Sequence, residues 1–490
     1  MNSSETIPAQ TKRNAPDYVW LTAILVLALV LRVLNLNAPL WYDEIVSVDT
    51  HLRLPWGSMM KSYAMNYHYL FNLEAKLAIG LFGEENWAVR LPAVIFGVGA
   101  VGAMWWLARD IAGARIAHLT ALLLAISYHH IWFSQNARGY TELAFFSTVG
   151  MVLFLRGMAR PSLKIWLTYG VILSLATFTH LTGAFAFAAQ GVVWLIVCAI
   201  GLLRKRPVPR QFVFPLIGYA VGGALTLLLY APILPSLLET IGGVSTTSQV
   251  DLMLEYQNPL WSLLEGVRTA IGSAGVVVPV LAASIIFLSI LGGVAASAKS
   301  PLYGPCVAVH IVLTLVLLLA LGMRIWPRFF FADIGFVLLL IVLGVRMVST
   351  WISTVVGARS GVVFVAASVA MIAISSALAV RNYTSPKQNL AGAYELVQAT
   401  RKGDDRVFAV GQAAALFTGY FGADWGVIMN DADYQKASSI QGPMLFVVAF
   451  PARSFRAVPL LDKDTEAGMT LVRRFAGTLG DGAMLVFRRD

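Results

Sequence analysis

The sequence predicts a polytopic α-helical membrane protein that carries a small α/β extramembrane domain at its C-terminus. Of its 490 residues, 58% are hydrophobic and only 13% are charged, and the mean hydropathy is +0.72. Soluble domains carry about 25% charged residues, and an apolar run of about 20 residues is long enough to cross a bilayer. Such runs recur up to residue 380, whereas residues 381–490 contain 13 Lys/Arg and 11 Asp/Glu. The composition therefore excludes a wholly water-soluble enzyme.

The apolar runs and the charges between them predict 11 spans, within a range of about 11 to 13. Lys12 and Arg13 precede the first run, and basic residues also follow later runs, as at 204–210. Because Lys and Arg concentrate in cytoplasmic loops, the N-terminus is expected in the cytoplasm. Seven runs have clear bounds and four more lie in the gaps between them; the seven are 18–36, 88–108, 116–127, 212–230, 269–296, 305–322 and 361–380.

Two domains are expected, a transmembrane domain at 1–380 and an extracytoplasmic domain at 381–490. The first external loop, 37–87, holds six acids against three bases. Its apolar stretch 67–82 is short and is interrupted by Glu74 and Lys76, which predicts interfacial rather than spanning helix. In the C-terminal domain, the pattern predicts a helix at 388–401 and strands at 406–410, 444–450, 469–475 and 483–487.

Unusual polar residues gather in the loops that are expected outside. Asp43 and Glu44 follow the first span, and acids at a membrane boundary point to a functional site. Arg138, Arg324 and Arg328 lie in later external segments. A carboxylate can accept the proton of an attacking hydroxyl, and Arg can neutralise a departing phosphate. The alternatives are that the acids lie in a solvated loop and that Arg138 and Arg328 only anchor spans by snorkelling.

Several motifs occur in a fixed order along this topology. They are Trp41-Tyr42-Asp43-Glu44, Phe82-Gly83 through Val89-Arg90-Leu91-Pro92, Ser134-Gln135-Asn136-Ala137-Arg138-Gly139-Tyr140, and Pro327-Arg328-Phe329. Together they resemble the GT-C glycosyltransferases, in particular the bacterial protein-mannosyltransferase and aminoarabinose-transferase branch (glycosyltransferase family 39/83-like). A His-Pro-Pro-Leu-Tyr-like patch of that branch reads Asn66-Tyr67-His68-Tyr69-Leu70 here, without either proline. The resemblance covers about residues 18–350 and extends loosely to the C-terminal domain.

The resemblance implies a GT-C fold and transfer of a single sugar from a polyprenyl-phosphate donor to an acceptor on the extracytoplasmic face, with inversion. By this likeness, Asp43 is the general base, oriented or assisted by Glu44. The implied donor-phosphate ligands are Arg138, His68 and Arg328, and Gln135 and Tyr140 are implied to shape the pocket. Arg324 is a further candidate phosphate ligand, and Tyr42 and His129 are further candidate pocket residues, because they lie in the same external segments.

No cofactor is expected to be required, although a divalent metal held by Glu44 and His68 is possible because carboxylate and imidazole both ligate metals. The expected partners are a polyprenyl-phosphate-linked sugar donor, a lipid, glycan or protein acceptor, and membrane lipids. The net charge of +10 is attributed to cytoplasmic Lys/Arg and lipid headgroups rather than to nucleic acid. The expected location is the bacterial inner membrane.

Two other functions fit the composition. A transporter or flippase of polyprenyl-linked or anionic lipids would place basic residues along a path through the membrane. The sequence shows no inverted repeat and no matching pair of Gly/Pro-broken helices, which such transporters often contain. An O-antigen ligase or polymerase would use pyrophosphate-linked oligosaccharides, and the acidic pair of the first loop argues against it. Clustering of the polar groups on one side favours a catalyst at an interface.

Overall fold

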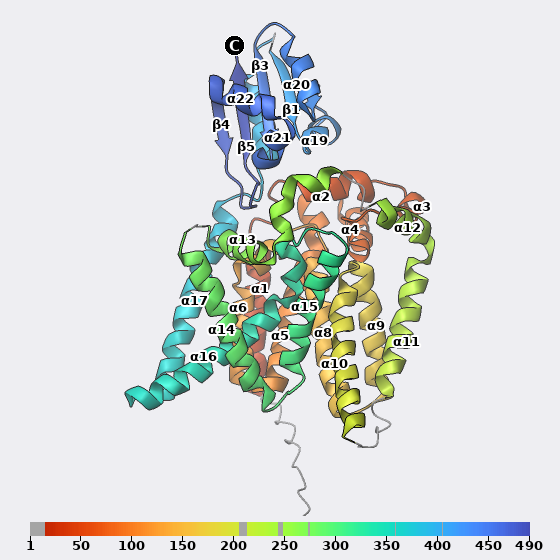
Figure 1. Cartoon of the computed structure of the whole chain (residues 1–490), viewed down its shortest axis with the longest axis vertical. Coiled ribbons are helices and arrows are strands. Elements are labelled where there is room, and N and C mark those ends of the chain that lie inside the picture. Colours follow the sequence, from red (N-terminus) through yellow and green to blue (C-terminus); the bar gives the residue numbers. More distant parts are fainter. Residues whose placement is uncertain (1–14, 205–212, 244–247, 273–274, 358, 404) are drawn as a thin grey trace, which may run out of the picture.

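The computed structural model describes residues 15–204, 213–243, 248–272, 275–357, 359–403 and 405–490. A bundle of long helices forms the larger part of the molecule, and a five-stranded sheet domain lies beyond one end of it (Figure 1). The predicted fold class is confirmed.

Each predicted span corresponds to one helix of the bundle. Nine stretches among the described residues are long and apolar enough to cross a membrane. The other two predicted spans fall on the 17-residue helix α9, which is shorter than these nine, and on the 12-residue helix α6, which is long enough only together with α7 after a 60° bend. The described residues therefore give nine or ten spans rather than the predicted 11. The helices are α1 (Ala15–Val33), α5 (Asn86–Ala112), α6 (Ala114–Ala125), α8 (Tyr140–Ala159), α9 (Leu163–Thr179), α10 (Gly183–Leu203), α11 (Phe214–Tyr230), α14 (Val277–Ser297), α15 (Tyr303–Ala320), α16 (Ile334–Val356) and α17 (Ser360–Thr384).

Shorter helices cover the end of the bundle that faces the sheet domain (Figure 1). The helix predicted at 67–82 is α4, which is too short to span a bilayer and packs against α5 and α9. The short elements are α2 (Tyr42–Ser47), η1 (Val48–Leu52), α3 (Trp56–Met59), α4 (Tyr69–Phe82), α7 (Tyr128–Ser134), η3 (Ala231–Ile233), α12 (Leu234–Gly243), η5 (Ser248–Gln257), α13 (Pro259–Ile271) and η6 (Pro327–Asp333).

The C-terminal domain is a mixed sheet in the order β2-β1-β3-β5-β4. Strand β1 is parallel to β2 and β3, whereas β5 is antiparallel to β3 and β4. The four predicted strands are present, and the three-residue β2 was not predicted because so short a strand shows no alternation. The elements are α18 (Leu390–Thr400), β1 (Arg406–Val410), α19 (Ala414–Gly419), β2 (Gly426–Ile428), α20 (Asp431–Ser438), β3 (Met444–Ala449), α21 (Pro451–Ala457), α22 (Pro459–Ala467), β4 (Thr470–Phe475) and β5 (Met484–Arg489).

The sheet domain packs directly on the loop that follows α1. One hydrophobic cluster contains Ile45 and Val48 of this loop together with Leu390 and Phe417 of the C-terminal domain. The indole Nε1 of Trp132 in α7 also donates a hydrogen bond to the Thr478 hydroxyl at 3.0 Å. Burial of shared apolar surface is the main favourable term in such docking, so the domain is held over the Asp43–Glu44 motif.

Candidate active site

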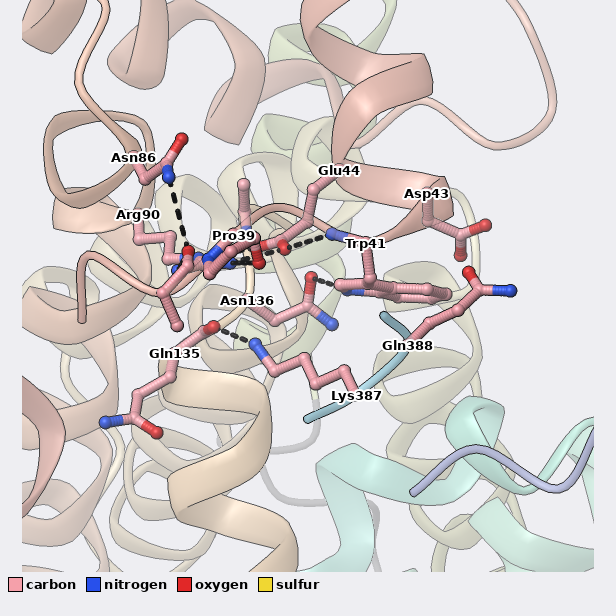
Figure 2. Close-up of polar contacts among 12 residues, drawn as sticks. Pro39, Trp41, Asp43, Glu44, Asn86, Arg90, Gln135, Asn136, Lys387 and Gln388 are labelled. Carbon is pink, nitrogen blue, oxygen red and sulfur yellow. Dashed lines mark hydrogen bonds and ion pairs between the residues drawn. The ribbon is translucent and has the colours of Figure 1, made fainter. Parts of the chain in front are cut away.

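Asp43 and Glu44 are neighbours in α2 but point in different directions (Figure 2). Successive side chains of an α-helix are separated by about 100° around its axis because the helix has 3.6 residues per turn. Glu44 is the third residue of α2 and reaches back to accept a hydrogen bond from the backbone N–H of Trp41 at 3.1 Å. Asp43 lies on the other side, away from the pair that Glu44 forms with Arg90 (Figure 2). The two acids therefore have different surroundings.

Glu44 is fully buried and forms a bidentate ion pair with Arg90 of α5. Its Oε1 accepts from Arg90 Nε at 2.7 Å and its Oε2 from Arg90 Nη2 at 2.6 Å. The backbone N–H of Ala137 donates a further bond to Oε1 at 2.7 Å. Arg90 in turn donates to the carbonyls of Leu36 and Ala38, both at 2.7 Å. Glu44 thus ties three of the sequence motifs together in space.

The environment of Glu44 strongly favours its ionised form. Burial acts to raise the pKa of Glu44, but the positive charges of Arg90 and Lys387 and the hydrogen bonds to Glu44 outweigh it and lower that pKa to about 2. The stabilisation of the fold by ionised Glu44 is therefore present above pH 4.5, the ordinary pKa of a glutamate, and is lost as the pH falls toward 2.

We expect Glu44 to contribute to the acid sensitivity of the fold. The difference in unfolding free energy between the wild type and Glu44→Gln should fall by about 3 kcal/mol between pH 4.5 and pH 2. Thermal unfolding of both proteins in detergent, followed by Trp fluorescence across this range, measures it. A difference that stays constant with pH would show that ionised Glu44 does not stabilise the fold.

Asp43 and Arg328 of η6 lie next to each other in the wall of a large cavity. Its Oδ2 accepts a hydrogen bond from Arg328 Nη1 at 3.3 Å, and the side chains are 17% and 35% exposed. The cavity has a volume of about 1970 Å³. Of the predicted residues, those that line it are Asp43, Tyr42, His129, Tyr140, Arg324 and Arg328. The structure thus places the predicted base beside a predicted phosphate ligand, although the two are 285 positions apart.

Gln135 does not line this cavity. Its side-chain amide donates to the carbonyls of Leu31, Arg32 and Leu34 at 3.3, 3.1 and 2.6 Å. These carbonyls belong to the C-terminal end of α1 and the residue after it, where an α-helix leaves acceptors without an intrahelical partner. In the structure Gln135 therefore holds the end of α1.

Behind the cavity wall lies a cluster of basic side chains. The His68 ring is 4.7 Å from the His180 ring and 4.5 Å from the Tyr140 ring, centroid to centroid. Arg138 is buried, and its Nη1 lies 3.5 Å from the Ser47 hydroxyl. Neither ring nitrogen of His68 has a hydrogen-bond partner among the described residues. The cluster gathers buried donors close to the Asp43 site.

The surroundings of His68 favour its neutral form. Burial lowers its pKa well below the usual range, and the charges of Arg138, His180 and Arg328 lower it further. A neutral imidazole still offers one N–H donor.

The predicted metal pair, Glu44 and His68, does not fit a metal ion. Each oxygen of Glu44 accepts two hydrogen bonds, which uses both lone pairs of that oxygen. Within the described ranges, no group of three or more His, Cys, Asp or Glu side chains is placed to hold a metal.

The sequence did not indicate the cavity residues of the C-terminal domain. Arg453, Asp481 and Gln412 line the same cavity as Asp43. They are more than 360 positions from Asp43 and belong to no shared local pattern. Contacts of such separation are formed only by the docking of the folded domain.

Comparisons with known proteins show what the chain is similar to. Residues 69–234 match the family described as "Dolichyl-phosphate-mannose-protein mannosyltransferase". A segment of 126 residues is 24% identical to the "Putative mannosyltransferase YycA" of Bacillus subtilis (strain 168). The matched segment is 26% of this chain and only 18% of that protein.

Two solved structures share the fold over most of the chain. One is ArnT from Cupriavidus metallidurans in the apo state, with 14% identity, a TM-score of 0.51 and coverage of 97% of this chain and 98% of that one. The other is the Archaeoglobus fulgidus oligosaccharyltransferase in the apo form, with 13% identity, a TM-score of 0.51 and coverage of 90% and 71%. The chain therefore shares the GT-C fold of these two structures, and residues 69–234, about a third of the chain, are similar to the mannosyltransferase family.

Proposed function

We propose that this protein transfers one sugar from a polyprenyl-phosphate donor to a hydroxyl group of an acceptor, with inversion at the anomeric carbon. The observation that carries the proposal is the position of Asp43 beside Arg328 in a cavity with both a polar end and a long apolar wall. The polar end supplies a carboxylate and guanidinium groups, and the apolar wall suits a lipid.

The apolar wall supports a polyprenyl group as the carrier. On α14 the lining residues extend from Leu281 to Ser297, which at 1.5 Å per residue is about 24 Å of helix. Most of the lining side chains of α14, α15 and α16 are aliphatic, among them Leu281, Ile285, Ile290, Ile311, Leu315 and Leu340. Exposing a hydrocarbon chain to water costs about 0.8 kcal/mol per CH₂, so an apolar wall allows the carrier chain to stay out of water while its phosphate is at the polar end. The matched family is named for a dolichyl-phosphate sugar, which has the same chemistry.

The polar end supports a base-assisted displacement. The Asp43 carboxylate accepts the proton of the acceptor hydroxyl as its oxygen bonds to the anomeric carbon. The bond from that carbon to the phosphate oxygen breaks, and the phosphate departs with the electron pair. Arg328 donates to Asp43 through Nη1, and its Nε has no partner among the described residues, so it can also donate to the phosphate. Attack opposite the leaving group inverts the configuration.

Other residues have supporting roles in this proposal. Arg324 lines the cavity four residues before Arg328 and adds positive charge near the departing phosphate. Arg138 and neutral His68 supply donors from behind the wall, whereas Tyr42, His129 and Tyr140 shape the pocket. Glu44 orients Asp43 by fixing α2 on Arg90.

We further propose that the cavity opens on the extracytoplasmic side of the bacterial inner membrane. The basic residues that precede α1 favour a cytoplasmic N-terminus. The polar end of the cavity is lined by Asp43, which follows α1 in the chain, and by Arg453 and Asp481 of the C-terminal domain, so this end lies away from those basic residues. This location gives the site access to a lipid-linked donor and to acceptors of the cell envelope.

Replacing Arg328 by Gln is expected to lower kcat by about 10²-fold, because one donor that stabilises the departing phosphate is lost. The measurement is release of polyprenyl phosphate by the purified full-length protein. Arg346→Gln is the matched control, since Arg346 is an exposed arginine of α16 that does not line the cavity. Equal kcat values for the two variants would remove Arg328 from the proposed mechanism.

A further inference from the structure

The C-terminal domain reaches the cavity through the turn between β3 and α21. Phe450, the residue between β3 and α21, adopts a left-handed conformation with φ of 51°, which costs about 1–3 kcal/mol for a residue other than glycine. The carboxylate of Asp481 holds the turn, because its two oxygens accept the N–H groups of Ala452 at 3.0 Å and Arg453 at 3.2 Å. The fixed turn therefore holds the side chains that it carries in defined positions.

The turn is packed against the residue that precedes the proposed base. The Phe450 ring meets the Tyr42 ring edge to face at 5.2 Å, with an angle of 86°. Arg453 lies over the Phe450 ring at 4.3 Å and 5.9 Å from the Trp326 ring. Arg328 lies 5.2 Å from the same Trp326 ring. Two guanidinium groups from different parts of the chain therefore share one indole beside Asp43.

The nitrogen donors of Arg453 are only partly used. Its Nε lies 3.4 Å from Asp481 Oδ2, without hydrogen-bond geometry. Among the described residues, no group accepts a hydrogen bond from its Nη1 or Nη2, and the side chain, which lines the cavity, is 25% exposed. Burial lowers the pKa of Arg453 and the charge of Arg328 lowers it further, whereas the charges of Asp481 and Asp43 act to raise it. The forked end of this guanidinium thus remains to bind a ligand.

Two like charges close together in a partly buried site repel each other unless an anion lies near both. Each guanidinium has one carboxylate beside it, Asp43 at 3.3 Å from Arg328 and Asp481 at 3.4 Å from Arg453, but the Nε of each arginine has no hydrogen-bond acceptor among the described residues. A planar guanidinium fork matches the oxygens of a phosphate or carboxylate. The pair formed by Arg328 and Arg453 therefore has the chemistry of a two-armed anion site.

We propose that Arg453 binds an anionic group of a substrate together with Arg328, so that the C-terminal domain forms part of the substrate site. The ligand is a phosphate or carboxylate group, carried either by the donor as its phosphate or by an anionic acceptor. This inference rests on the proposed glycosyl transfer for the identity of the substrates, but binding of the anion itself does not depend on turnover.

The test uses the full-length protein with Arg453→Gln, Arg453→Lys and a matched control, Arg456→Gln. Arg456 lies on the same helix and pairs with Glu255 at 3.1 Å, but it does not line the cavity. The measurements are the Kd of a polyprenyl monophosphate in detergent, the KM of donor and acceptor separately, and the unfolding temperature. Arg453→Gln is expected to weaken anion binding about 10- to 100-fold, Arg453→Lys less, and Arg456→Gln not at all.

The outcomes distinguish the donor phosphate from an anionic acceptor as the bound group. They also distinguish failure of this inference from failure of the proposed glycosyl transfer. A raised Kd for polyprenyl monophosphate assigns Arg453 to the donor phosphate, whereas a raised acceptor KM alone assigns it to an anionic acceptor. If Arg453→Gln fails to fold, the Lys variant decides, since it keeps a charge. Unchanged Kd and KM values in a folded Arg453 variant overturn the inference. Failure of the proposed function has a different result, which is that the Asp43→Asn variant keeps full turnover.

Discussion

Replacing Asp43 by Asn is expected to lower kcat by about 10²- to 10⁴-fold, the usual contribution of a positioned general base. Asparagine keeps the shape of the side chain but cannot accept the proton of the attacking hydroxyl. Folding should be little affected, because Asp43 is partly exposed and makes one ion pair at 3.3 Å, and pairs of this kind contribute about 0–1 kcal/mol. The KM of the donor should change less than kcat.

The measurement is steady-state turnover of reconstituted protein with the donor that the wild type uses. Asp49→Asn is the control, since Asp49 lies in the adjacent η1, pairs with Arg53 at 3.0 Å and does not line the cavity. Turnover by Asp43→Asn at the rate of the Asp49 variant would exclude Asp43 as the base.

Replacing Arg90 by Leu is expected to destabilise the protein by about 3–5 kcal/mol, because it leaves the charge of Glu44 buried without its partner. Both side chains are at most 2% exposed, so water cannot replace the lost donors. The carbonyls of Leu36 and Ala38 lose their donor as well. Since Glu44 fixes α2, activity should also fall through displacement of Asp43.

Unfolding of the Arg90 variant in detergent, by heat or denaturant, gives the size of this effect. Arg53→Leu is the matched control, because Arg53 forms an exposed pair with Glu84 at 2.8 Å, whose loss should cost about 1 kcal/mol or less. Equal losses in the two variants would mean that the buried pair has no special structural role.

The transmembrane part of the fold was predictable because a bilayer demands long apolar segments with charges at their ends. The helix α5 (Asn86–Ala112) was recognised at 88–108 in this way. The bend between α6 and α7 was not, because Ser127 caps the new helix by accepting from the N–H of His130 at 3.5 Å, and a single serine is a weak signal. In the sheet domain, β1 was predicted with its correct bounds from its apolar residues.

The candidate site was predictable in its parts but not in its geometry. Motifs drew attention to Asp43 and Arg328, which the fold brings together. The same motifs could not show that Glu44 turns away toward Arg90, because this depends on which face of α2 is buried. Arg453 was missed because its position depends on the docking of a domain that begins more than 330 residues after Asp43. Local patterns describe elements, whereas contacts of this separation depend on tertiary packing.

Release of polyprenyl monophosphate by the reconstituted full-length protein is the most direct measurement. The protein is supplied with polyprenyl-phosphate sugars and an extract of envelope acceptors, and the released lipid and the glycosylated product are quantified together. We expect monophosphate and product in equal amounts, with the anomeric configuration inverted, and neither from Asp43→Asn. Movement of intact labelled lipid between leaflets without release, or release of a pyrophosphate from a pyrophosphate-linked donor, would contradict the proposed reaction.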